Sequence, residues 1–260
     1  MSETQNQFVT MDLIAARTWV AETTSNIGHW MLRSSQGLTK RANSVLAIGA
    51  YPDDADWLHK SEQFYRERSL PALFHVSMAS PHGLDELLAH NGYELNTPCF
   101  FMTANSQDVK ENVSNVLPKK KPSPLEIQWS EQADADWLGA YLRLEQYPSS
   151  RKAFYAGLFA RMASPKGFVQ LKHDGQAVAV GTAIVEADWS GFVNIVVSEG
   201  YRGQGIGYVL MGALTEWSMV HGASKQYLQV IADNEPALAL YRKLGYSELY
   251  LYHYRIKNDL

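Results

Sequence analysis

The stretch from Val193 to Leu214, VNIVVSEGYRGQGIGYVLMGAL, constrains the fold more than any other part of the sequence. It begins as a β-branched run typical of a strand, passes through the glycine-rich segment RGQGIG, and continues with the apolar spacing of an amphipathic helix. A strand that ends at Val197 before a helix that starts in the glycines brings unpaired backbone N–H groups and a positive helix end together. The stretch therefore predicts an anion site whose geometry suits a pyrophosphate.

The residues of this loop favour an anion as well. Gly203, Gly205 and Gly207 have no Cβ to keep a phosphate from the backbone, and Arg202 adds a positive charge. The dinucleotide fingerprint does not fit, because it requires glycine where Tyr208 stands, and a Walker A loop requires Lys-Ser/Thr after its last glycine. If the glycines alone are considered, the alternative to an anion site is a flexible turn that leads into a core helix.

The composition excludes several other classes of protein. The chain has 260 residues and a formal charge of −4, so a nucleic acid or an anionic membrane is disfavoured as a partner. Cys99 is the only cysteine, which excludes an internal disulfide, and the histidines lack the spacing of a zinc site. The sequence shows no secretory leader and no run of about 18 apolar residues. We therefore expect a cytoplasmic protein that uses no metal.

Prolines and lysines mark a boundary in the middle of the chain. The segment VLPKKKPSP predicts an exposed linker at residues 118–124, between domains at 1–117 and 125–260. An anion-binding patch is the alternative function of its three lysines, although short charge runs beside proline are usually solvated.

The second domain shows the pattern of an α/β fold. We expect an antiparallel meander with turns at Asp174-Gly175 and Ser190-Gly191, and an edge strand at the C-terminus. The expected segments are strand 125–129, helices 135–146 and 150–163, strands 167–173, 177–187 and 191–197, a helix from 206 that ends before Gly222, strand 227–231, helix 235–244 and strand 246–256.

The first half repeats the end of this plan. Residues 72–104 and 226–256 each show a strand, a loop, a short helix that ends in Gly-Tyr, and another strand. The first half has no glycine loop. We therefore expect two similar units in tandem.

Two motifs resemble the acetyl-CoA-binding core of the GNAT superfamily of N-acetyltransferases. Residues 202–207 match its R-x-x-G-x-G loop, and residues 234–246 match its N-x-x-A-x-x-x-Y-x-x-x-G-F/Y helix. The resemblance implies a GNAT fold, an α/β architecture with a mixed, mostly antiparallel central sheet flanked by helices. The first half resembles a degenerate GNAT-like domain without the acetyl-CoA loop, as in a bacterial tandem-GNAT group.

The resemblance implies a site for acetyl-CoA. The end of the strand would pair with the pantetheine arm, the loop would cradle the pyrophosphate, and Asn234 would contact the cofactor. A helix N-cap is the alternative role of Asn234. The implied cofactor-binding residues are Ile195, Val196, Val197, Arg202, Gly203, Gln204, Gly205, Ile206, Gly207, Tyr208 and Asn234.

Catalysis requires a proton to leave the amine and the departing thiolate to be stabilised. The family motif implies that Tyr241 lies near the sulfur, where its phenol can return a proton; packing on the sheet is its alternative role. Many members carry a glutamate base on the fifth strand, but Gln229 stands there and can only orient an acceptor or a water. Glu186 is the candidate base, with Asp188 and Glu145 as alternatives.

Two further groups of residues carry weaker hypotheses. His253 is expected on an edge strand, whose alternate tyrosines either pack or wall an acceptor pocket. Trp30, Arg33, Arg41 and Asn43 flank a hairpin turn and could line the acceptor side of a cleft.

The sequence thus predicts an acetyl-CoA-dependent N-acetyltransferase that transfers an acetyl group directly to a primary amine of a small molecule or amino acid. A protein amine is the alternative acceptor. A non-catalytic acyl-CoA-binding regulatory module is the alternative from another class, because Gln229 replaces a carboxylate. We expect a monomer whose domains form a pseudo-dimer, or a homodimer.

Overall fold

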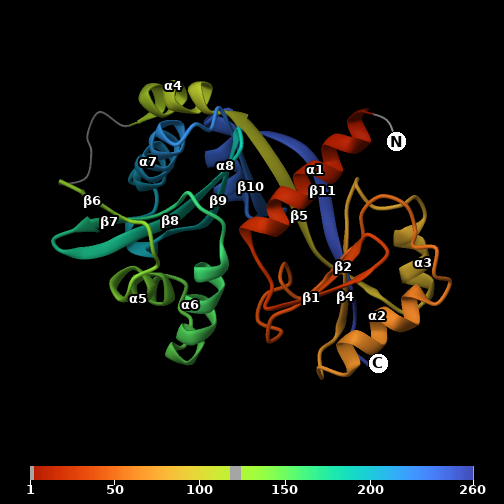
Figure 1. Ribbon diagram of the computed structural model, residues 1–260. Coiled ribbons are helices and arrows are strands. Elements are labelled where there is room, and N and C mark those ends of the chain that lie inside the picture. Colours follow the sequence, from red (N-terminus) through yellow and green to blue (C-terminus); the bar gives the residue numbers. More distant parts are fainter. Residues whose placement is uncertain (1–2, 118–123, 260) are drawn as a thin grey trace. The chain divides into compact units, whose positions relative to one another are not determined.

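The computed structural model describes residues 3–117 and 124–259 (Figure 1). It contains two compact units. Unit 1 comprises Met1–Phe100 with Tyr250–Leu260, and unit 2 comprises Phe101–Leu249.

These limits differ from the predicted domains 1–117 and 125–260. Helix α4 (Ser106–Val116) packs against α7 (Ile206–Val220) of unit 2, and the end of β11 (Ser247–Lys257) pairs with β4 (Ala72–Val76) of unit 1. The limits of the two units are therefore set by contacts between segments far apart in the sequence. The predicted linker at 118–124, with its three lysines, lies outside the described residues apart from Pro124.

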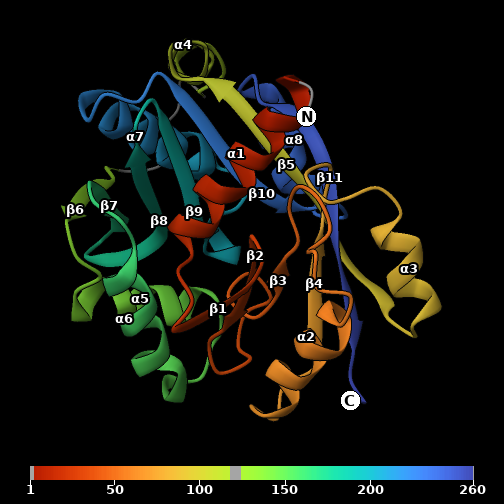
Figure 2. The same cartoon turned by 45° about the vertical axis from the view of Figure 1, so that its right-hand side comes forward.

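Unit 1 is a sheet in the order β1-β2-β3-β4-β11 with helices on both faces (Figure 2). Trp30 and Phe74 pack with α2 on one face, whereas Leu46 and Ile48 pack with α1 on the other. The sequence pattern did not predict α1. The elements not yet named are α1 (Glu3–Thr18), β1 (Thr23–Ile27), β2 (Trp30–Ser34), β3 (Val45–Leu46), α2 (Trp57–Arg66), α3 (Leu84–His90) and β5 (Glu94–Asn105), of which β5 continues into unit 2.

The closing strand β11 is not an edge strand, so that expectation for His253 is wrong. Its neighbours in the sheet are β4 and β5. His253 Nε2 lies 2.6 Å from Asp85 Oδ1, and the Arg255 guanidinium donates to both Asp85 oxygens at 2.7 and 2.8 Å. Arg255 and His253 lower the pKa of Asp85 to about 2. The tyrosines of this strand, Tyr250, Tyr252 and Tyr254, are buried in unit 1.

Three of the four residues near the predicted hairpin belong to the core of unit 1. Trp30 is fully buried, and the buried Arg33 donates to the Ser44 carbonyl at 3.1 Å. Asn43 Oδ1 accepts from two backbone N–H groups of the hairpin loop. Arg33 and Asn43 thus hold the loop, Trp30 packs in the core, and none of the three is displayed for an acceptor.

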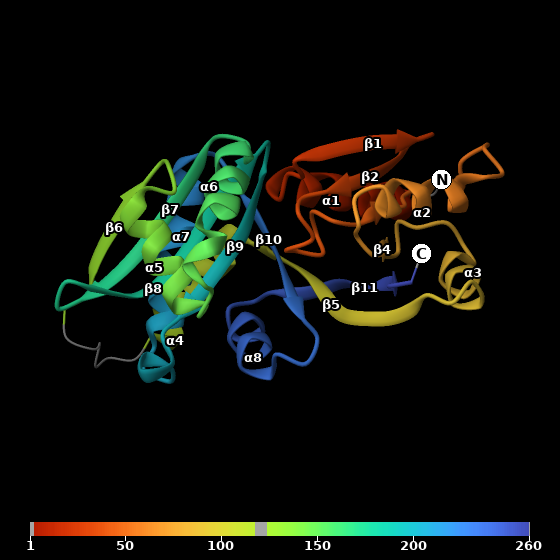
Figure 3. The ribbon, with the colours of Figure 1, turned by 90° about the horizontal axis from the view of Figure 1, so that it is seen from below.

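Unit 2 has the strand order β5-β10-β9-β8-β7-β6. The antiparallel meander β7-β8-β9 is confirmed, and β10 runs parallel to β9. Helices α5 and α6 cover one face of these strands, and α7 covers the other (Figure 3). The remaining elements are β6 (Glu126–Ser130), α5 (Ala135–Leu144), η1 (Ser149–Arg151), α6 (Lys152–Arg161), β7 (Lys166–His173), β8 (Gln176–Glu186), β9 (Trp189–Val197), η2 (Glu199–Tyr201), β10 (Lys225–Ile231) and α8 (Glu235–Lys243).

The turn between β8 and β9 is not at Ser190-Gly191, as predicted, but at Ala187-Asp188. Ala187 has φ +52°, and Asp188 accepts from the Ser224 backbone N–H at 3.2 Å. Gly191 lies inside β9. A glycine is required there because the phenol of Tyr227 occupies the position that a Cβ would take. Gly191 therefore makes room for the packed Tyr227 ring and does not form the turn.

The tandem repeat is confirmed. In both units a strand, a loop and a short helix lead to glycine in the left-handed region, Gly92 with φ +82° and Gly245 with φ +92°, followed by a strand. This is the helix-ending conformation that glycine adopts without steric cost. None of the described helices is long and apolar enough to cross a bilayer.

We expect Gly191→Ala to lower the free energy of unfolding by about 1–3 kcal/mol, because the new Cβ must displace the buried Tyr227 ring. Chemical denaturation measures the loss. The control is Gly139→Ala in α5, where a Cβ meets nothing within 4 Å and alanine favours the helix. Equal stability of the two variants would contradict the packing role of Gly191.

Candidate active site

The pairing between β9 and β10 covers only half of β9. In the described residues, the paired residues of the two strands extend from Trp189 with Lys225 to Phe192 with Leu228 and no further. On its other side β9 stays paired with β8 up to Val197. The backbone of Ile195, Val196 and Val197, the predicted pantetheine-binding segment, therefore has one edge that no described strand occupies.

A β-bulge marks the place where the two strands separate. The register of β8 and β9 shifts between Val180 and Thr182, and Asn194 has φ +57°. The Asn194 side chain donates to Thr182 Oγ1 at 3.1 Å. Bulges of this kind bend a strand and re-aim its side chains. Neither residue was singled out from the sequence, although an asparagine inside the run VNIVV was a usable signal.

The glycine loop has the backbone conformation that the anion-site prediction needs. Gly203 and Gly205 have φ +75° and +85°, and Gly205 is the N-cap of α7. The Tyr208 and Val209 N–H groups both donate to the Gly205 carbonyl, at 3.0 and 3.2 Å. In the described chain no hydrogen bond is recorded from the N–H groups of Gly205, Ile206 and Gly207. These N–H groups lie at the N-terminal, positive end of a helix of 15 residues.

Gly207 has a different purpose from the other two glycines. A Cβ at this position would lie 3.0 Å from Leu240 Cδ2 of α8. Glycine therefore allows α7 and α8 to approach each other closely. Since Tyr241 follows Leu240, this approach brings the helix with the candidate acid next to the loop.

Two side chains of the loop donate to backbone carbonyls, one at the strand end and one within the loop. Arg202 is exposed, and its Nε–H donates to the Val197 carbonyl at 3.3 Å. Gln204 Nε2 donates to the Gly200 carbonyl at 3.0 Å. Arg202 thus keeps a positive charge at the end of β9.

Asn234 is the N-cap of α8, as its alternative role predicted. Its Oδ1 accepts from the Ala237 N–H at 3.3 Å. Its nitrogen has no recorded partner in the described residues, so a contact with a cofactor stays a prediction.

Tyr241 is almost completely buried, with 6% of its surface exposed. Its ring centroid lies 5.8 Å from that of Tyr246. Burial raises the pKa of the Tyr241 phenol above its ordinary value. The Tyr246 hydroxyl donates to Gln226 Oε1 at 2.6 Å, whereas no described residue hydrogen-bonds the Tyr241 hydroxyl. Tyr241 is therefore a neutral donor without a partner in the described chain.

Of the two candidates Gln229 and Glu186, only Gln229 lies near the place where β9 and β10 separate. Gln229 is on β10 just past the last recorded pair with β9, where it is half-buried. Glu186 pairs with Trp189 at the opposite end of β9 from the loop. Eight residues separate Trp189 from Val197, which is roughly 26 Å at the rise of a strand. The structure does not bring Glu186 to the loop.

Glu145, an alternative base, is close to the loop. It is the half-buried C-cap of α5, and the neighbouring Arg143 donates to the Ala177 carbonyl of β8 at 3.0 Å. Burial raises the pKa of the Glu145 carboxyl above its ordinary value, and the positive charge of Arg202 opposes this shift. A raised pKa brings a carboxylate nearer to that of an effective general base.

The other alternative, Asp188, has structural partners. It forms an ion pair with Lys225 at 3.0 Å in addition to its bonds to Ser224. Among the described residues, no group of three or more His, Cys, Asp or Glu side chains is arranged to hold a metal ion.

Comparison with known proteins identifies this arrangement. The model of a family described as probable histone acetyltransferase Rv0428c C-terminal matches residues 7–255. The uncharacterized N-acetyltransferase YobR of Bacillus subtilis (strain 168) is 36% identical over 247 residues, which cover 95% of this chain and 97% of YobR. The ribosomal protein bS18-alanine N-acetyltransferase of Escherichia coli (strain K12) is 31% identical over 106 residues, which cover 41% of this chain and 69% of that enzyme.

Solved structures share the fold. A GCN5-related N-acetyltransferase from Kribbella flavida has a TM-score of 0.71 at 17% identity and covers 100% of this chain and 97% of its own. A tandem GNAT protein from the clavulanic acid biosynthesis pathway has a TM-score of 0.67 at 13% identity, with coverages of 98% and 94%.

The fold is thus that of GNAT proteins, and the relatives named N-acetyltransferases show that the chain is an acyltransferase. The chain belongs to the family described as probable histone acetyltransferase Rv0428c C-terminal.

We expect the pKa of the Glu145 carboxyl to lie above its ordinary value, and the variant Arg202→Ala to raise it further by removing the opposing charge. Carbon NMR of the side-chain carboxyl across a pH series measures both values. Because the folded group keeps its proton to higher pH than the unfolded group, its contribution to stability falls as the pH rises above the ordinary pKa of the carboxyl. The control Arg242→Ala removes an exposed arginine paired with Glu248 and leaves the Glu145 titration unchanged. An identical shift in both variants would contradict a specific effect of Arg202.

Proposed function

We propose that this protein transfers an acetyl group from acetyl-CoA directly to a primary amine of a small molecule or amino acid. The carrying observation is the open edge of β9 that leads into the unbonded N–H groups of Gly205, Ile206 and Gly207. An extended amide-bearing arm can pair with such an edge, and a pyrophosphate suits the helix N-terminus that follows it. Arg202 supplies a positive charge at the same place.

The residues around the loop support the assignment of the two proton transfers to two different side chains. Acetyl-CoA supplies an activated thioester, and the chain must accept a proton from the amine and stabilise the leaving thiolate. Tyr241 is protonated at neutral pH, as any phenol near its ordinary pKa is, and burial raises its pKa further, so its hydroxyl serves as donor to the sulfur. Glu145, with its raised pKa, is a better candidate base than Glu186, which lies at the far end of β9. Gln229 is left to orient the acceptor.

A protein amine is the second candidate acceptor. The relative in Escherichia coli is named for acetylating an alanine of a ribosomal protein, and the matching family is described as a probable histone acetyltransferase. These names are the support for a macromolecular amine as the alternative acceptor. Family membership disfavours the regulatory module without catalysis.

We expect Gly205→Glu to abolish acetyl-CoA binding, because it places a carboxylate where the phosphates would lie. Gly205→Ala has the same strain from the positive φ but no charge, so it weakens binding less. Calorimetry with acetyl-CoA measures both. A panel of small amines, amino acids and peptide N-termini with a thiol-release readout then identifies the acceptor class. Wild-type binding retained in Gly205→Glu would contradict the cofactor role of the loop.

We expect Tyr241→Phe to lower kcat by about 10²–10⁴-fold while the affinity for acetyl-CoA is kept, since only the proton donor is lost. The matched control is Tyr246→Phe, whose hydroxyl is bonded to Gln226. That variant keeps its turnover but loses about 1 kcal/mol of stability in denaturation. Full turnover in Tyr241→Phe would exclude it as the acid.

A further inference from the structure

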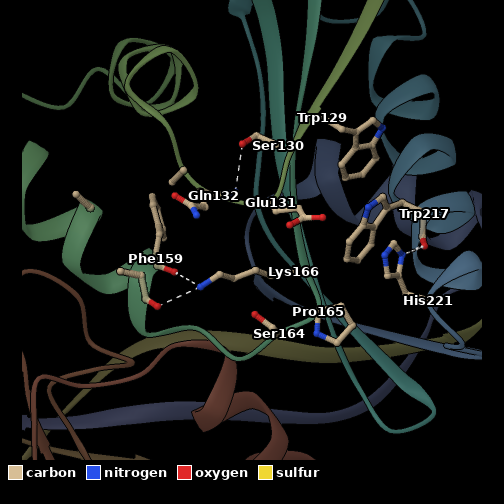
Figure 4. A pocket seen from close by; sticks show the side chains of 13 residues that line it. Trp129, Ser130, Glu131, Gln132, Phe159, Ser164, Pro165, Lys166, Trp217 and His221 are labelled. Atoms are coloured by element: carbon tan, nitrogen blue, oxygen red, sulfur yellow. Dashed lines mark hydrogen bonds between the residues drawn. The ribbon is translucent and has the colours of Figure 1, made fainter.

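Unit 2 contains a pocket that the proposed function does not use. Its volume is about 1080 Å³, large enough for a drug-sized molecule. It lies between the β6–α5 loop, the end of α6, the start of β7 and the end of α7 (Figure 4). Trp217 in its wall follows Ile206 by eleven residues, so it stands roughly 16 Å along α7 from the glycine loop.

One wall of the pocket is aromatic. The rings of Trp129 and Trp217 are stacked with centroids 5.5 Å apart, and His221 stacks on Trp217 at 3.8 Å. A Cβ at Gly167 would lie 2.6 Å from the Trp217 ring, so glycine lets the tryptophans rest on β7. The wall is a preformed apolar surface.

The electrostatics of the pocket favour a cation. Glu131 and Lys166 are the charged residues in its lining, apart from His221. Lys166 donates to the carbonyls of Phe159, Ala160 and Met162 at 2.9, 3.1 and 2.9 Å, so its charge neutralises the C-terminal end of α6. Ammonium has three N–H donors, and these bonds use all of them.

Glu131 is left with its charge uncompensated. It has no recorded ion pair or hydrogen bond in the described part of the chain, and Figure 4 shows its carboxylate beside the two indole rings. The C-terminal end of α7, which carries a partial negative charge, borders the pocket at His221. The His221 Nδ1–H is already donated to the Trp217 carbonyl at 2.8 Å.

We propose that this pocket binds an organic ammonium ion, with the ammonium group at Glu131 and its apolar body along Trp129 and Trp217. A carboxylate next to aromatic surface is the combination that recognises such cations. The site is separate from the glycine loop and does not depend on acetyl transfer.

The test uses the full chain without acetyl-CoA. Calorimetry compares phenethylammonium with phenethyl alcohol, which has a similar body and no charge. We expect the ammonium ion to bind at least tenfold more tightly than the alcohol. Proton–nitrogen NMR of the indole N–H groups locates the site, because the signals of Trp129 and Trp217 shift on binding.

Glu131→Gln should weaken binding of phenethylammonium about tenfold, the effect of losing one charge-assisted contact. The exposed Glu131 has no recorded bond to lose, so the variant keeps its fold. The matched control is Glu126→Gln, an exposed glutamate of β6 outside the pocket lining, which leaves the affinity unchanged. Equal binding of ammonium ion and alcohol, unchanged affinity in Glu131→Gln, or indole shifts confined to other tryptophans would each overturn the proposal.

Discussion

The ending of the β9–β10 ladder at Phe192 and Leu228 is the constraint on which the candidate site depends. A continued ladder would satisfy the backbone of Ile195 to Val197 within the sheet and leave nothing for a ligand to pair with. The bulge at Asn194, held by Thr182, bends β9 at the point of separation. The same strand then ends at the glycine loop, so an open strand edge and a helix N-terminus are consecutive in one chain segment.

The close approach of α7 and α8 complements this opening. Gly207 admits Leu240, and the next residue, Tyr241, is thereby buried beside the helix that carries the loop. Burial raises the pKa of both candidate groups for proton transfer, the Tyr241 phenol and the Glu145 carboxyl. The phenol is protonated at neutral pH at its ordinary pKa as well, whereas the raised pKa brings Glu145 toward the range of a base. Residue type separates the two roles, because the ordinary pKa of a phenol lies far above that of a carboxyl.

Unit 1 repeats the plan of strand, loop, helix and Gly-Tyr, but its chemistry is different. Its helix α3 corresponds to α8, and α2, which precedes β4, takes the place that α7 has before β10. The chain enters α2 through Asp53, Asp54 and Asp56, without a glycine loop. Negative side chains at a helix N-terminus take the place that an anion would need. This describes in physical terms why the first unit is degenerate.

The sequence by itself determined the strand, glycine loop and helix from Val193 onward, the N-cap at Asn234 and the tandem repeat. Each depends on local signals: apolar period, the left-handed region open to glycine, and a capping side chain. Only the tertiary structure decided that Gly191 packs against Tyr227, that β11 is an inner strand, and that Glu145 and not Glu186 lies near the loop. These depend on strand register and helix packing between distant segments, which no local pattern encodes.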